Sequence, residues 1–409
     1  MALFWIDRFL LEAANRIANA VGLNIELRSN ILSSSNSDQL TIRVANQRTL
    51  ARLLIDPDQS FGDAYSQGRL EVQGDLVLVL EKLFACAARV PNWIPRLRTA
   101  WLRCTQANSL RGARRNIEHH YDLPTDFYEL WLDPELVYTC AYFPQPQATL
   151  EEAQRAKLDL ICKKLWLRPG EIVVEAGCGW GAFSLYMARE YGVRVKAYNI
   201  SREQIMFARN KANEQGLSRE VEFIEDDYRN IHGHCDVFVS VGMLEHVGLD
   251  RYRDLGQVIN RAIGDSGRGF LHFIGRNFPT PLSPWIQKRV FPGAYPPSLR
   301  EAMEVLEAHD FSVMDLENLR AHYALTLRHW LDRFERSYHL VVSQFGEPFA
   351  RMWRLYLAGS IAAFDVGTLQ LFQVVFAGRK CANVPWTRRD GSHAKKLKPI
   401  GDVWIPAMS

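Results

Sequence analysis

Residues 173–183, "VVEAGCGWGAF", decide the fold of this chain. Apolar residues open the stretch like a buried strand, and glycines follow at every second position from 177 to 181. Gly177 and Gly179 let the chain turn and let its backbone approach a ligand closely. Gly181 lets the following helix pack tightly against the strand. A strand, a glycine loop and a helix in this order predict the cofactor-binding start of an α/β sheet.

The chemistry of this loop favours S-adenosylmethionine as the cofactor. Its spacing is G-x-G-x-G rather than the G-x-G-x-x-G of dinucleotide sites, and Glu175 stands at the end of the strand. S-adenosylmethionine has no pyrophosphate to place on a helix N-terminus. It has an α-ammonium and a carboxylate, which a carboxylate and bare amides can bind. A nicotinamide dinucleotide site and a chance glycine-rich turn are the alternatives.

The second strand of the pattern is expected to end at the ribose of the cofactor. It reads "YNISREQ" over 198–204, which places Asn199 and Ile200 at the cofactor and has no acid before Glu203. Gln204 is therefore predicted to bind the ribose hydroxyls. The alternative is a capping box, in which Ser201 and Gln204 serve only to start a helix.

The third strand is followed by "EDDYRN" at 225–230. An acid at this place can bind the adenine amino group, and an aromatic ring can cover the face of the base. Asp227 and Tyr228 are therefore predicted to complete the cofactor site.

Around the loop the chain alternates between strands and helices. Thr149 and Glu152 form a predicted capping box for a helix with Leu158, Ile161 and Leu165 on one face. Five strands follow in the order "IVVE", "VRVKAY", "VEFIE", "DVFVSV" and "GFLHFI". A helical, aromatic-rich region from about 279 to 365 precedes a last strand, "LFQVVFA". The pattern predicts an α/β fold, a parallel, doubly wound Rossmann-like methyltransferase sheet with a helical insertion.

The rest of the chain divides into three further parts. Residues 1–95 are predicted to form a smaller α+β domain, which opens with an amphipathic helix; membrane binding or packing on its own domain would use its apolar face. The runs "LTIRVA" and "RTLARLLI" are strand-like, and a turn-rich segment from 61 leads into a helix. Residues 96–117 hold six arginines and no acid, which fits a solvated linker or a face for anionic lipid. The catalytic domain is expected over 118–380, and 381–409 read as a basic tail.

Composition indicates a soluble globular protein, with 47% apolar and 23% charged residues and a net charge of +3. The 7 cysteines form no C-x-x-C pair or zinc spacing, which favours a reducing cytoplasm, and no metal site is expected. Charged residues interrupt the apolar N-terminus, so neither a signal peptide nor a membrane span fits. No nucleic-acid partner is expected.

Seven segments together resemble one known family. They are "NIEHHYDLPTDFYELWLDPELVYTCAYF", "EAGCGWG", "NISREQ", "DDYRN", "SVGMLEHVG", "LHFIG" and "YALTLRHWLDRF", in this order. The set resembles the cyclopropane-fatty-acyl-phospholipid synthases, and the enzymes that modify mycolic acids and some plant alkaloid N-methyltransferases are similar. The clear resemblance covers about 116–378. Residues 1–95 resemble, less specifically, the extra N-terminal domain of the bacterial phospholipid enzymes.

The resemblance implies a reaction and a set of site residues. Such an enzyme uses S-adenosylmethionine to methylate a cis double bond of a phospholipid acyl chain; the resulting carbocation loses a proton and closes a cyclopropane ring. The family holds a bicarbonate ion as the base, and its ligands map onto Cys140, Glu245, His272, Ile274 and Tyr323. Tyr138 and Thr139 would touch the cofactor. The family also implies a homodimer in the cytoplasm, bound peripherally to the inner face of the membrane.

The resemblance also settles how Cys140 is interpreted. Within "YTCAYF" the thiol alone fits a nucleophile, a metal ligand or part of a wall, and the family favours the wall. His272 and Tyr323 taken alone would be packing residues. Amides near Cys140 and Ile274, with the side chains of His272 and Tyr323, are expected to donate to the anion. Glu245 fits by accepting a hydrogen bond from the bicarbonate hydroxyl.

Some features leave other interpretations open. Residues 119–122, "HHYD", are expected to form a lid over the cofactor rather than a metal site or a structural turn. Glu175 stands where the family often has aspartate. The same carbocation would yield a methyl or methylene branch if it met a different fate. A small-molecule methyltransferase and a non-catalytic lipid-binding module are the remaining alternatives.

Overall fold

The computed structural model describes residues 11–12, 14–16, 18–28, 40–87 and 123–384. Much of the predicted opening helix lies outside these residues. The arginine-rich segment 96–117, the expected lid at 119–122 and all but the first residues of the tail 381–409 also lie outside them.

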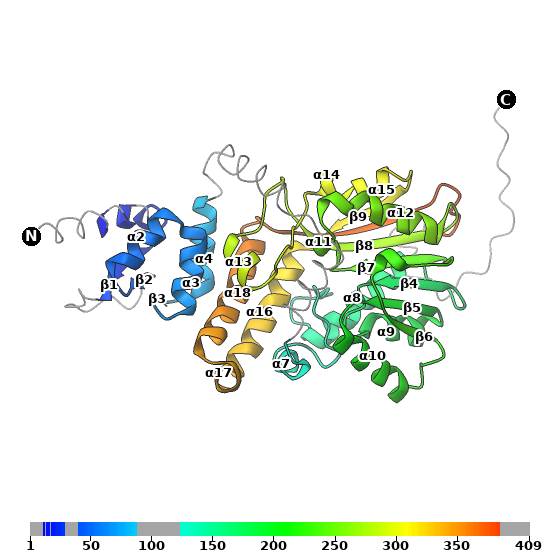
Figure 1. The fold of residues 1–409 in the computed structure, drawn as a ribbon, viewed down its shortest axis with the longest axis horizontal. Helices are drawn as coiled ribbons and strands as arrows, with labels where there is room; N and C mark the ends of the chain where they lie inside the picture. Colours follow the sequence, from blue (N-terminus) through cyan, green and yellow to red (C-terminus); the bar gives the residue numbers. More distant parts are fainter. Residues whose placement is uncertain (1–10, 13, 17, 29–39, 88–122, 385–409) are drawn as a thin grey trace, which may run out of the picture.

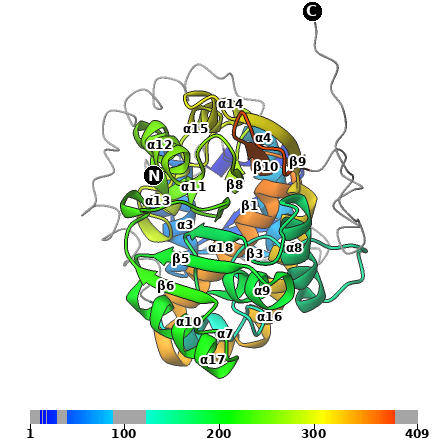
Figure 2. The ribbon, with the colours of Figure 1, turned by 90° about the vertical axis from the view of Figure 1, so that its right-hand side faces the viewer.

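A seven-stranded sheet with the strand order β6-β5-β4-β7-β8-β10-β9 forms the centre of the molecule. Its strands are β4 (Ile172–Ala176), β5 (Arg194–Asn199), β6 (Val221–Glu225), β7 (Val237–Val241), β8 (Arg268–Gly275), β9 (Ser312–Asn318) and β10 (Gln370–Ala377). The first five in this order pair in parallel, as the sequence predicts. The fold class is therefore confirmed, because helices cover both faces of this sheet (Figures 1 and 2).

The prediction of a wholly parallel sheet is wrong at one edge. β10 pairs antiparallel with both β8 and β9. β9 itself was expected to be part of the helical region, but it forms the exposed edge of the sheet. Its sequence, "SVMDLEN", has no continuous apolar run, because an edge strand with a solvated face does not need one.

Helices α8 (Leu150–Lys164), α9 (Ala182–Tyr191), α10 (Arg202–Glu214) and α12 (Tyr252–Ile263) flank the sheet, with α11 (Leu244–Val247), α14 (Leu299–Ala302) and α15 (Glu304–Glu307) on short connections. Two short 3₁₀ turns are η2 (Tyr228–Asn230) and η3 (Leu249–Arg251). The predicted capping box of α8 is present: the Thr149 hydroxyl accepts from the Glu152 N–H, and the Glu152 carboxylate accepts from the Thr149 N–H. This cap starts the helix whose side chains hold the segment with Tyr138 and Thr139.

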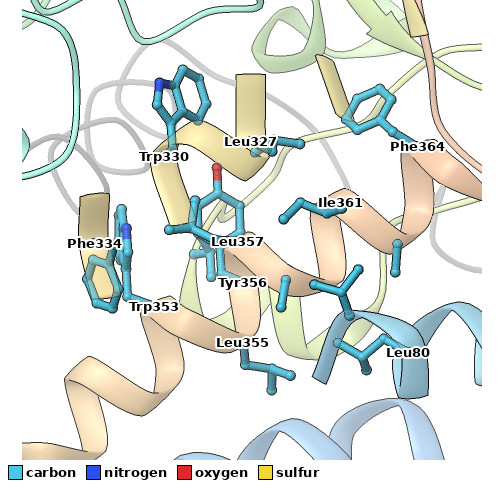
Figure 3. Close-up of a cluster of buried hydrophobic side chains, with 14 of the residues drawn as sticks. Leu80, Leu327, Trp330, Phe334, Trp353, Leu355, Tyr356, Leu357, Ile361 and Phe364 are labelled. Carbon is cyan, nitrogen blue, oxygen red and sulfur yellow. The ribbon is translucent and has the colours of Figure 1, made fainter. Parts of the chain in front are cut away.

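Two long helices, α16 (Arg320–Arg336) and α18 (Glu347–Asp365), form a layer between the sheet and the N-terminal part, and the short α17 (Tyr338–Phe345) lies between them in the chain (Figure 1). Figure 3 shows Trp353, Leu357 and Ile361 of α18 packed toward α16, while Leu355 lies toward the N-terminal helices. The short helices α7 (Thr125–Glu129) and α13 (Pro284–Arg289) lie beside this layer. One hydrophobic core runs from Leu50 and Leu80 into these helices, so the N-terminal part shares its core with the rest.

The N-terminal part contains β1 (Asn24–Leu27), β2 (Thr41–Val44), β3 (Leu70–Gln73), α2 (Gln47–Ile55), α3 (Pro57–Ser66) and α4 (Leu76–Ala87), which is an α+β arrangement. The strand expected at "RTLARLLI" is wrong, because this run is the helix α2. Asn46 caps it by accepting from the Thr49 N–H at 3.0 Å, and leucines repeat at helical spacing. The turn-rich segment contains α3, which Asp56 caps and Pro57 starts.

No helix in the described ranges is long and apolar enough to cross a membrane.

Candidate active site

One cavity of about 1360 Å³ opens at the carboxyl ends of the parallel strands, where α/β sheets bind ligands. It brings together most of the predicted site residues: Tyr138, Thr139, Glu175, Gly177, Gly179, Asn199, Gln204, Glu245, His272, Ile274 and Tyr323. Five others, Cys140, Gly181, Ile200, Asp227 and Tyr228, do not line it. The predicted cofactor residues and the predicted anion residues therefore share one chamber.

The glycine loop adopts the backbone that its sequence predicts. Gly179 has φ +55°, and a Cβ added there would have open space around it, which leaves room for a ligand. Gly181 has φ +87°, and a Cβ there would lie 2.7 Å from the Phe223 ring and 2.8 Å from Ala208. Gly181 thus serves the packing of the loop against β6 and α10, while Gly179 leaves backbone open to the cavity.

Glu175 is a buried carboxylate at the end of β4. Its side chain is only 2% exposed, and it accepts a hydrogen bond from the Ser184 hydroxyl. Burial raises the pKa of Glu175 to about 7, although the Ser184 bond and the Lys157 ammonium act in the opposite direction. A cationic ligand in the cavity would stabilise the charged form, as the predicted contact with the cofactor ammonium requires.

Gln204 presents an unpartnered amide to the cavity. The Asn199 Nδ2 donates to the Gln204 Oε1 at 2.7 Å and to the Gly179 carbonyl at 3.3 Å, which orients both amides. The Gln204 Nε2 is buried without a partner. The predicted capping box is only half present, because Ser201 accepts from the Gln204 N–H while its own N–H donates to Asn199. A donor aimed at a cavity fits a ribose hydroxyl.

Asp227 and Tyr228 lie beside the cavity rather than on its wall. The Asp227 carboxylate accepts from the Arg229 N–H at 3.0 Å, so it caps the short turn η2. The Arg229 guanidinium stands 5.2 Å from the centre of the Tyr228 ring. Their assignment to the adenine therefore stays a prediction.

The segment that carries Tyr138 and Thr139 has no regular structure and is held by side chains of α8. Gln154 donates to the carbonyls of Val137 and Thr139, at 3.1 and 2.9 Å. The Lys157 ammonium donates to the Thr139 hydroxyl at 3.0 Å. These bonds replace a backbone ladder and fix Tyr138 and Thr139 on the cavity wall.

Lys157 was not predicted as a site residue, although the spacing of polar residues along its helix was a signal for it. One face of α8 carries residues at helical spacing that are mostly polar: Gln154, Lys157, Ile161 and Lys164. Burial lowers the pKa of Lys157 to about 8, against the opposing effect of Asp133.

Cys140 is fully buried behind the cavity wall. Its thiol donates to the Ala141 carbonyl at 3.1 Å, and burial raises the pKa of the thiol far above its usual range. A thiol held neutral in this way is a poor nucleophile. Across the described ranges, no group of three or more His, Cys, Asp or Glu residues could hold a metal ion. Because Cys140 is not among the residues that line the cavity, its place in the wall around a bound anion stays a prediction.

Glu245 extends a carboxylate from α11 to the end of β8. Its Oε1 accepts from the Ile274 N–H at 2.5 Å, while its Oε2 is buried without a partner. Burial raises the pKa of Glu245 to about 7. The Ile274 amide, which was expected to donate to a bound anion, is thus already used by Glu245. Of the two carboxylate oxygens of Glu245, only Oε2 is left as an acceptor for a ligand, and Glu245 is one of the residues that line the cavity.

His272 is held in one tautomer by a relay that sequence reasoning missed. In the β8–β10 register Gln373 lies opposite His272, and its Nε2 stands 3.2 Å from the His272 Nδ1. The Gln373 Oε1 accepts from the Lys164 ammonium at 2.7 Å, so the amide can only donate to His272. The proton of the imidazole is therefore on Nε2, which is buried, has no partner and belongs to a cavity-lining residue.

The charge state of His272 agrees with this relay. Burial and the nearby Lys157 and Lys164 ammonium groups lower its pKa well below its usual value, so the ring is neutral. Lys164 in turn pairs with Glu317 at 2.5 Å and Asp315 at 3.6 Å on β9. A glutamine inside the apolar strand "LFQVVFA" was the available sequence signal for this relay.

Tyr323 joins the cavity from α16. Its side chain is 8% exposed, and its ring lies 4.6 Å from the Phe364 ring and 6.0 Å from the Trp330 ring. Nearby, the hydroxyls of Tyr138 and Tyr356 share a hydrogen bond of 2.8 Å. Tyr138, Tyr323 and Tyr356 therefore give the cavity that Glu245 and His272 also line an aromatic wall.

Known proteins with the same sequence pattern identify the family. The family described as mycolic acid cyclopropane synthetase matches residues 108–374. The cyclopropane-fatty-acyl-phospholipid synthase of Escherichia coli strain K12 is 34% identical over 372 residues, 89% of this chain and 92% of that protein. The chain belongs to the mycolic acid cyclopropane synthetase family. The resemblance stated from the sequence is thereby confirmed.

Other relatives agree with this assignment. A probable fatty acid methyltransferase of Pseudomonas putida is 34% identical over 87% of this chain and 92% of its own length. The crystal structure of the mycolic acid cyclopropane synthase CmaA1 complexed with S-adenosylhomocysteine and CTAB has a TM-score of 0.62 and 30% identity, and covers 64% of this chain and 97% of that one. The enzyme is therefore an S-adenosylmethionine-dependent methyltransferase that uses this cofactor.

Proposed function

We propose that the enzyme transfers a methylene group from S-adenosylmethionine to a cis double bond in a phospholipid acyl chain, forming a cyclopropane ring. The observation that carries this proposal is the joint cavity, in which the cofactor loop and the Glu245–His272 pair meet an apolar chamber. The similarity to the Escherichia coli phospholipid enzyme over 89% of this chain supports the substrate class.

The cavity has the shape and lining that an acyl chain requires. Beyond Tyr323 it continues past apolar residues of α16 and α18 and then into the N-terminal part, where Ile42, Leu80 and Phe84 line it. Its apolar walls exclude water from the reacting bond, which protects a carbocation from capture. An unsaturated hydrocarbon chain fits such a chamber better than a polar small molecule does.

The residues of the cavity fit S-adenosylmethionine at one end. Glu175 supplies a buried carboxylate for the ammonium, and Gln204 supplies a free amide donor for a hydroxyl. When bound, the cofactor supplies the electrophilic methyl group. The chain's own contribution is to align that methyl with a poorly nucleophilic alkene, since a well-oriented pair reacts far faster than free partners.

The Glu245–His272 pair fits a bicarbonate ion. The His272 Nε2–H is an unpartnered donor and the Glu245 Oε2 is an unpartnered acceptor, and a bicarbonate has both an acceptor oxygen and a hydroxyl donor. When bound, the ion supplies a weak base for the proton that the substrate cation must lose. Cys140 contributes the wall behind the site, and Tyr323 contributes an aromatic face and a hydroxyl.

The aromatic wall has its own role in this proposal. The faces of Tyr323, Tyr138 and Tyr356 carry partial negative charge, and a desolvated ring stabilises a nearby cation by about 1–2 kcal/mol. These rings line the same cavity as the residues at the strand ends. They would lower the energy of the carbocation without capturing it.

An open-chain product is the second candidate, favoured by the similarity to a probable fatty acid methyltransferase. The test is to incubate the enzyme with methyl-labelled S-adenosylmethionine and vesicles of a mono-unsaturated phospholipid, then to analyse the acyl chains by mass spectrometry and NMR. Label in a cyclopropane methylene is the expected result. Label in a methyl or methylene branch would change the product, and label in no lipid would point to a small-molecule acceptor.

We also propose that the enzyme works as a homodimer in the cytoplasm, bound peripherally to the inner face of the membrane. The apolar side chains of Ile55, 83% exposed, and Phe278, 51% exposed, line the cavity and support a lipid-facing mouth. Flotation of the enzyme with anionic vesicles and sedimentation of the free enzyme test the two statements separately.

A further inference from the structure

Arg276 directly follows β8, which ends at Gly275, and lines the same cavity as the residues of the anion site. Side chains alternate along a strand, and His272, Ile274 and Arg276 all line the cavity whereas Phe273 and Gly275 do not. Arg276 lies four positions after His272 along extended chain, so their Cα atoms lie about 13 Å apart. A guanidinium is thus placed on the wall of the chamber at a defined distance from the reacting end.

Among the described residues, Arg276 has no counter-charge. Its Nε is buried without a hydrogen-bond partner, and its guanidinium forms no ion pair with any described residue. Burial lowers the pKa of Arg276 to about 10, which reflects the cost of desolvating its charge. A partly buried guanidinium whose Nε has no partner is most stable when an anion joins it.

Arg268, at the other end of the same strand, is treated differently. It is 1% exposed, and both of its terminal nitrogens reach the Glu171 carboxylate, at 3.0 and 2.8 Å. Arg268 also donates to the carbonyls of Leu165 and Trp166. The fold therefore gives the structural arginine, Arg268, a carboxylate partner. The unpartnered Nε of Arg276 points instead to a ligand.

The other charges of the cavity do not supply that partner. Its acidic side chains are Glu175, Glu245, Asp56 and Asp58, and none forms an ion pair with Arg276. Glu175 and Glu245 lie at the carboxyl ends of β4 and β8, and Asp56 caps α3. The hydroxyls of Thr280 and Ser283 and the half-exposed Phe278 line the cavity close to Arg276 in the chain.

We propose that Arg276 binds the phosphodiester of the phospholipid head group. The acyl chain then runs inward from Arg276 to the Glu245–His272 pair. The proposal rests on the proposed function and names the part of the substrate that this end of the site recognises. A guanidinium binds a phosphate with two parallel hydrogen bonds, which makes it suited to hold a lipid at a fixed depth.

The distance from Arg276 to His272 then determines which double bond of the acyl chain reaches the reacting end of the cavity. With the head group held at Arg276, only a double bond at one range of distances from it reaches the pair at the far end. The cofactor carboxylate and the bicarbonate are the competing anions. Both belong to the end of the cavity with Glu175, Glu245 and His272, about 13 Å along the strand from the Arg276 backbone.

The test compares Arg276→Gln and Arg276→Lys with the wild-type enzyme on two substrates in nonionic detergent micelles. One is a mono-unsaturated phosphatidylglycerol, and the other is the diacylglycerol with the same acyl chains, which lacks the phosphate. Arg300→Gln removes an equal charge from an exposed helix position outside the cavity and is the matched control. Affinity for S-adenosylhomocysteine and thermal stability are measured for each variant.

Arg276→Gln is expected to lower kcat/KM for the phospholipid about 10- to 100-fold, with no change for the diacylglycerol. Arg276→Lys should restore part of the loss, and Arg300→Gln should resemble wild type. Stability should not fall, because the substitution removes a partly buried charge that has no ion pair among the described residues. Equal losses on both substrates, or no loss on the phospholipid, would overturn the proposal.

Two further outcomes separate the sources of the anion. A loss of S-adenosylhomocysteine affinity in Arg276→Gln would assign the arginine to the cofactor. Inhibition of diacylglycerol turnover by millimolar inorganic phosphate, abolished by the same substitution, would assign it to a free anion. If the wild-type enzyme binds cofactor but converts neither lipid, the proposed function fails and this inference fails with it.

Discussion

The relay from Lys164 through Gln373 to His272 makes a sharp prediction, because one isosteric change should reverse the imidazole tautomer. In Gln373→Glu the carboxylate still accepts from Lys164, but its second oxygen can only accept from His272 as well. The proton then moves to Nδ1, and Nε2 becomes an acceptor facing the cavity. The site loses its N–H donor although its shape is unchanged.

The size of the effect follows from the two hydrogen bonds. The neutral bond that favours Nε2–H contributes about 1 kcal/mol, and the charge-assisted bond that replaces it favours Nδ1–H by about 2 kcal/mol. The swing of about 3 kcal/mol changes the ratio of Nε2–H to Nδ1–H roughly 150-fold, so the active tautomer falls from about 85% to about 3% of the population, a loss of about 25-fold. Gln373→Met removes the bond to His272 without replacing it and also removes the acceptor of Lys164, so through the tautomer alone its kcat should fall less than about twofold.

The assay is the initial rate of S-adenosylhomocysteine formation on mono-unsaturated vesicles at pH 8, with long-range ¹H–¹⁵N NMR to read the tautomer. The loss should appear in kcat, while the affinity for S-adenosylhomocysteine stays unchanged. At lower pH the glutamate should favour a doubly protonated ring, which restores an Nε2–H and part of the rate. A Gln373→Glu enzyme with wild-type kcat, or one that keeps Nε2–H in the spectrum, would refute the reasoning.

Three other predictions follow from the site and its packing. Because burial raises the pKa of Glu245 from 4.5 to about 7, the folded state holds a proton that the unfolded state releases, and wild-type stability falls as pH rises through this window. At pH 8 the free energy of unfolding of Glu245→Gln should therefore exceed that of wild type by up to about 3 kcal/mol, and its melting temperature in calorimetry should be higher. The difference should be smaller at pH 5, and equal differences at both pH values would contradict this. Glu175, with its pKa raised to about 7, must ionise to hold a cation, so S-adenosylhomocysteine affinity should increase with pH between 6 and 8 and become weak and pH-independent in Glu175→Gln, as titration calorimetry would measure; an unchanged pH profile in the variant would remove Glu175 from the site. Gly181→Ala should destabilise by about 2–4 kcal/mol, since its Cβ would meet Phe223 at 2.7 Å and its φ of +87° disfavours a side chain, whereas Gly359→Ala, with open space around it, should be neutral or stabilising in urea unfolding.

The periodic elements could be predicted because their signals are local. The strand at Ile172–Ala176, the glycine loop and the capped helix α8 each record their conformation in a few neighbouring residues. The site residues after strand ends were also predictable, because parallel strands bring their carboxyl ends to one edge. Their functional meaning came from the joint resemblance to a family, since His272 or Tyr323 alone would be taken for packing.

The errors occurred where a short apolar run fits two structures. The run at 48–55 satisfies strand and helix patterns alike, and the Asn46 cap decided for α2. β9 became a strand because β10 offered it a partner, although its own sequence is mostly polar. Such choices depend on pairing energies between segments far apart in the chain, which no local pattern records.

The sequence by itself determined the class of fold, the cofactor loop and the family, because these depend on periodicity and on the order of local motifs. Only the tertiary structure decided which polar atoms find partners. It set Gln373 beside His272, 101 residues away, and so selected a tautomer. It paired Arg268 with Glu171 and left the Nε of Arg276 without a hydrogen-bond partner among the described residues. Satisfaction of buried polar groups is a property of three-dimensional neighbours, and residue order alone does not specify it.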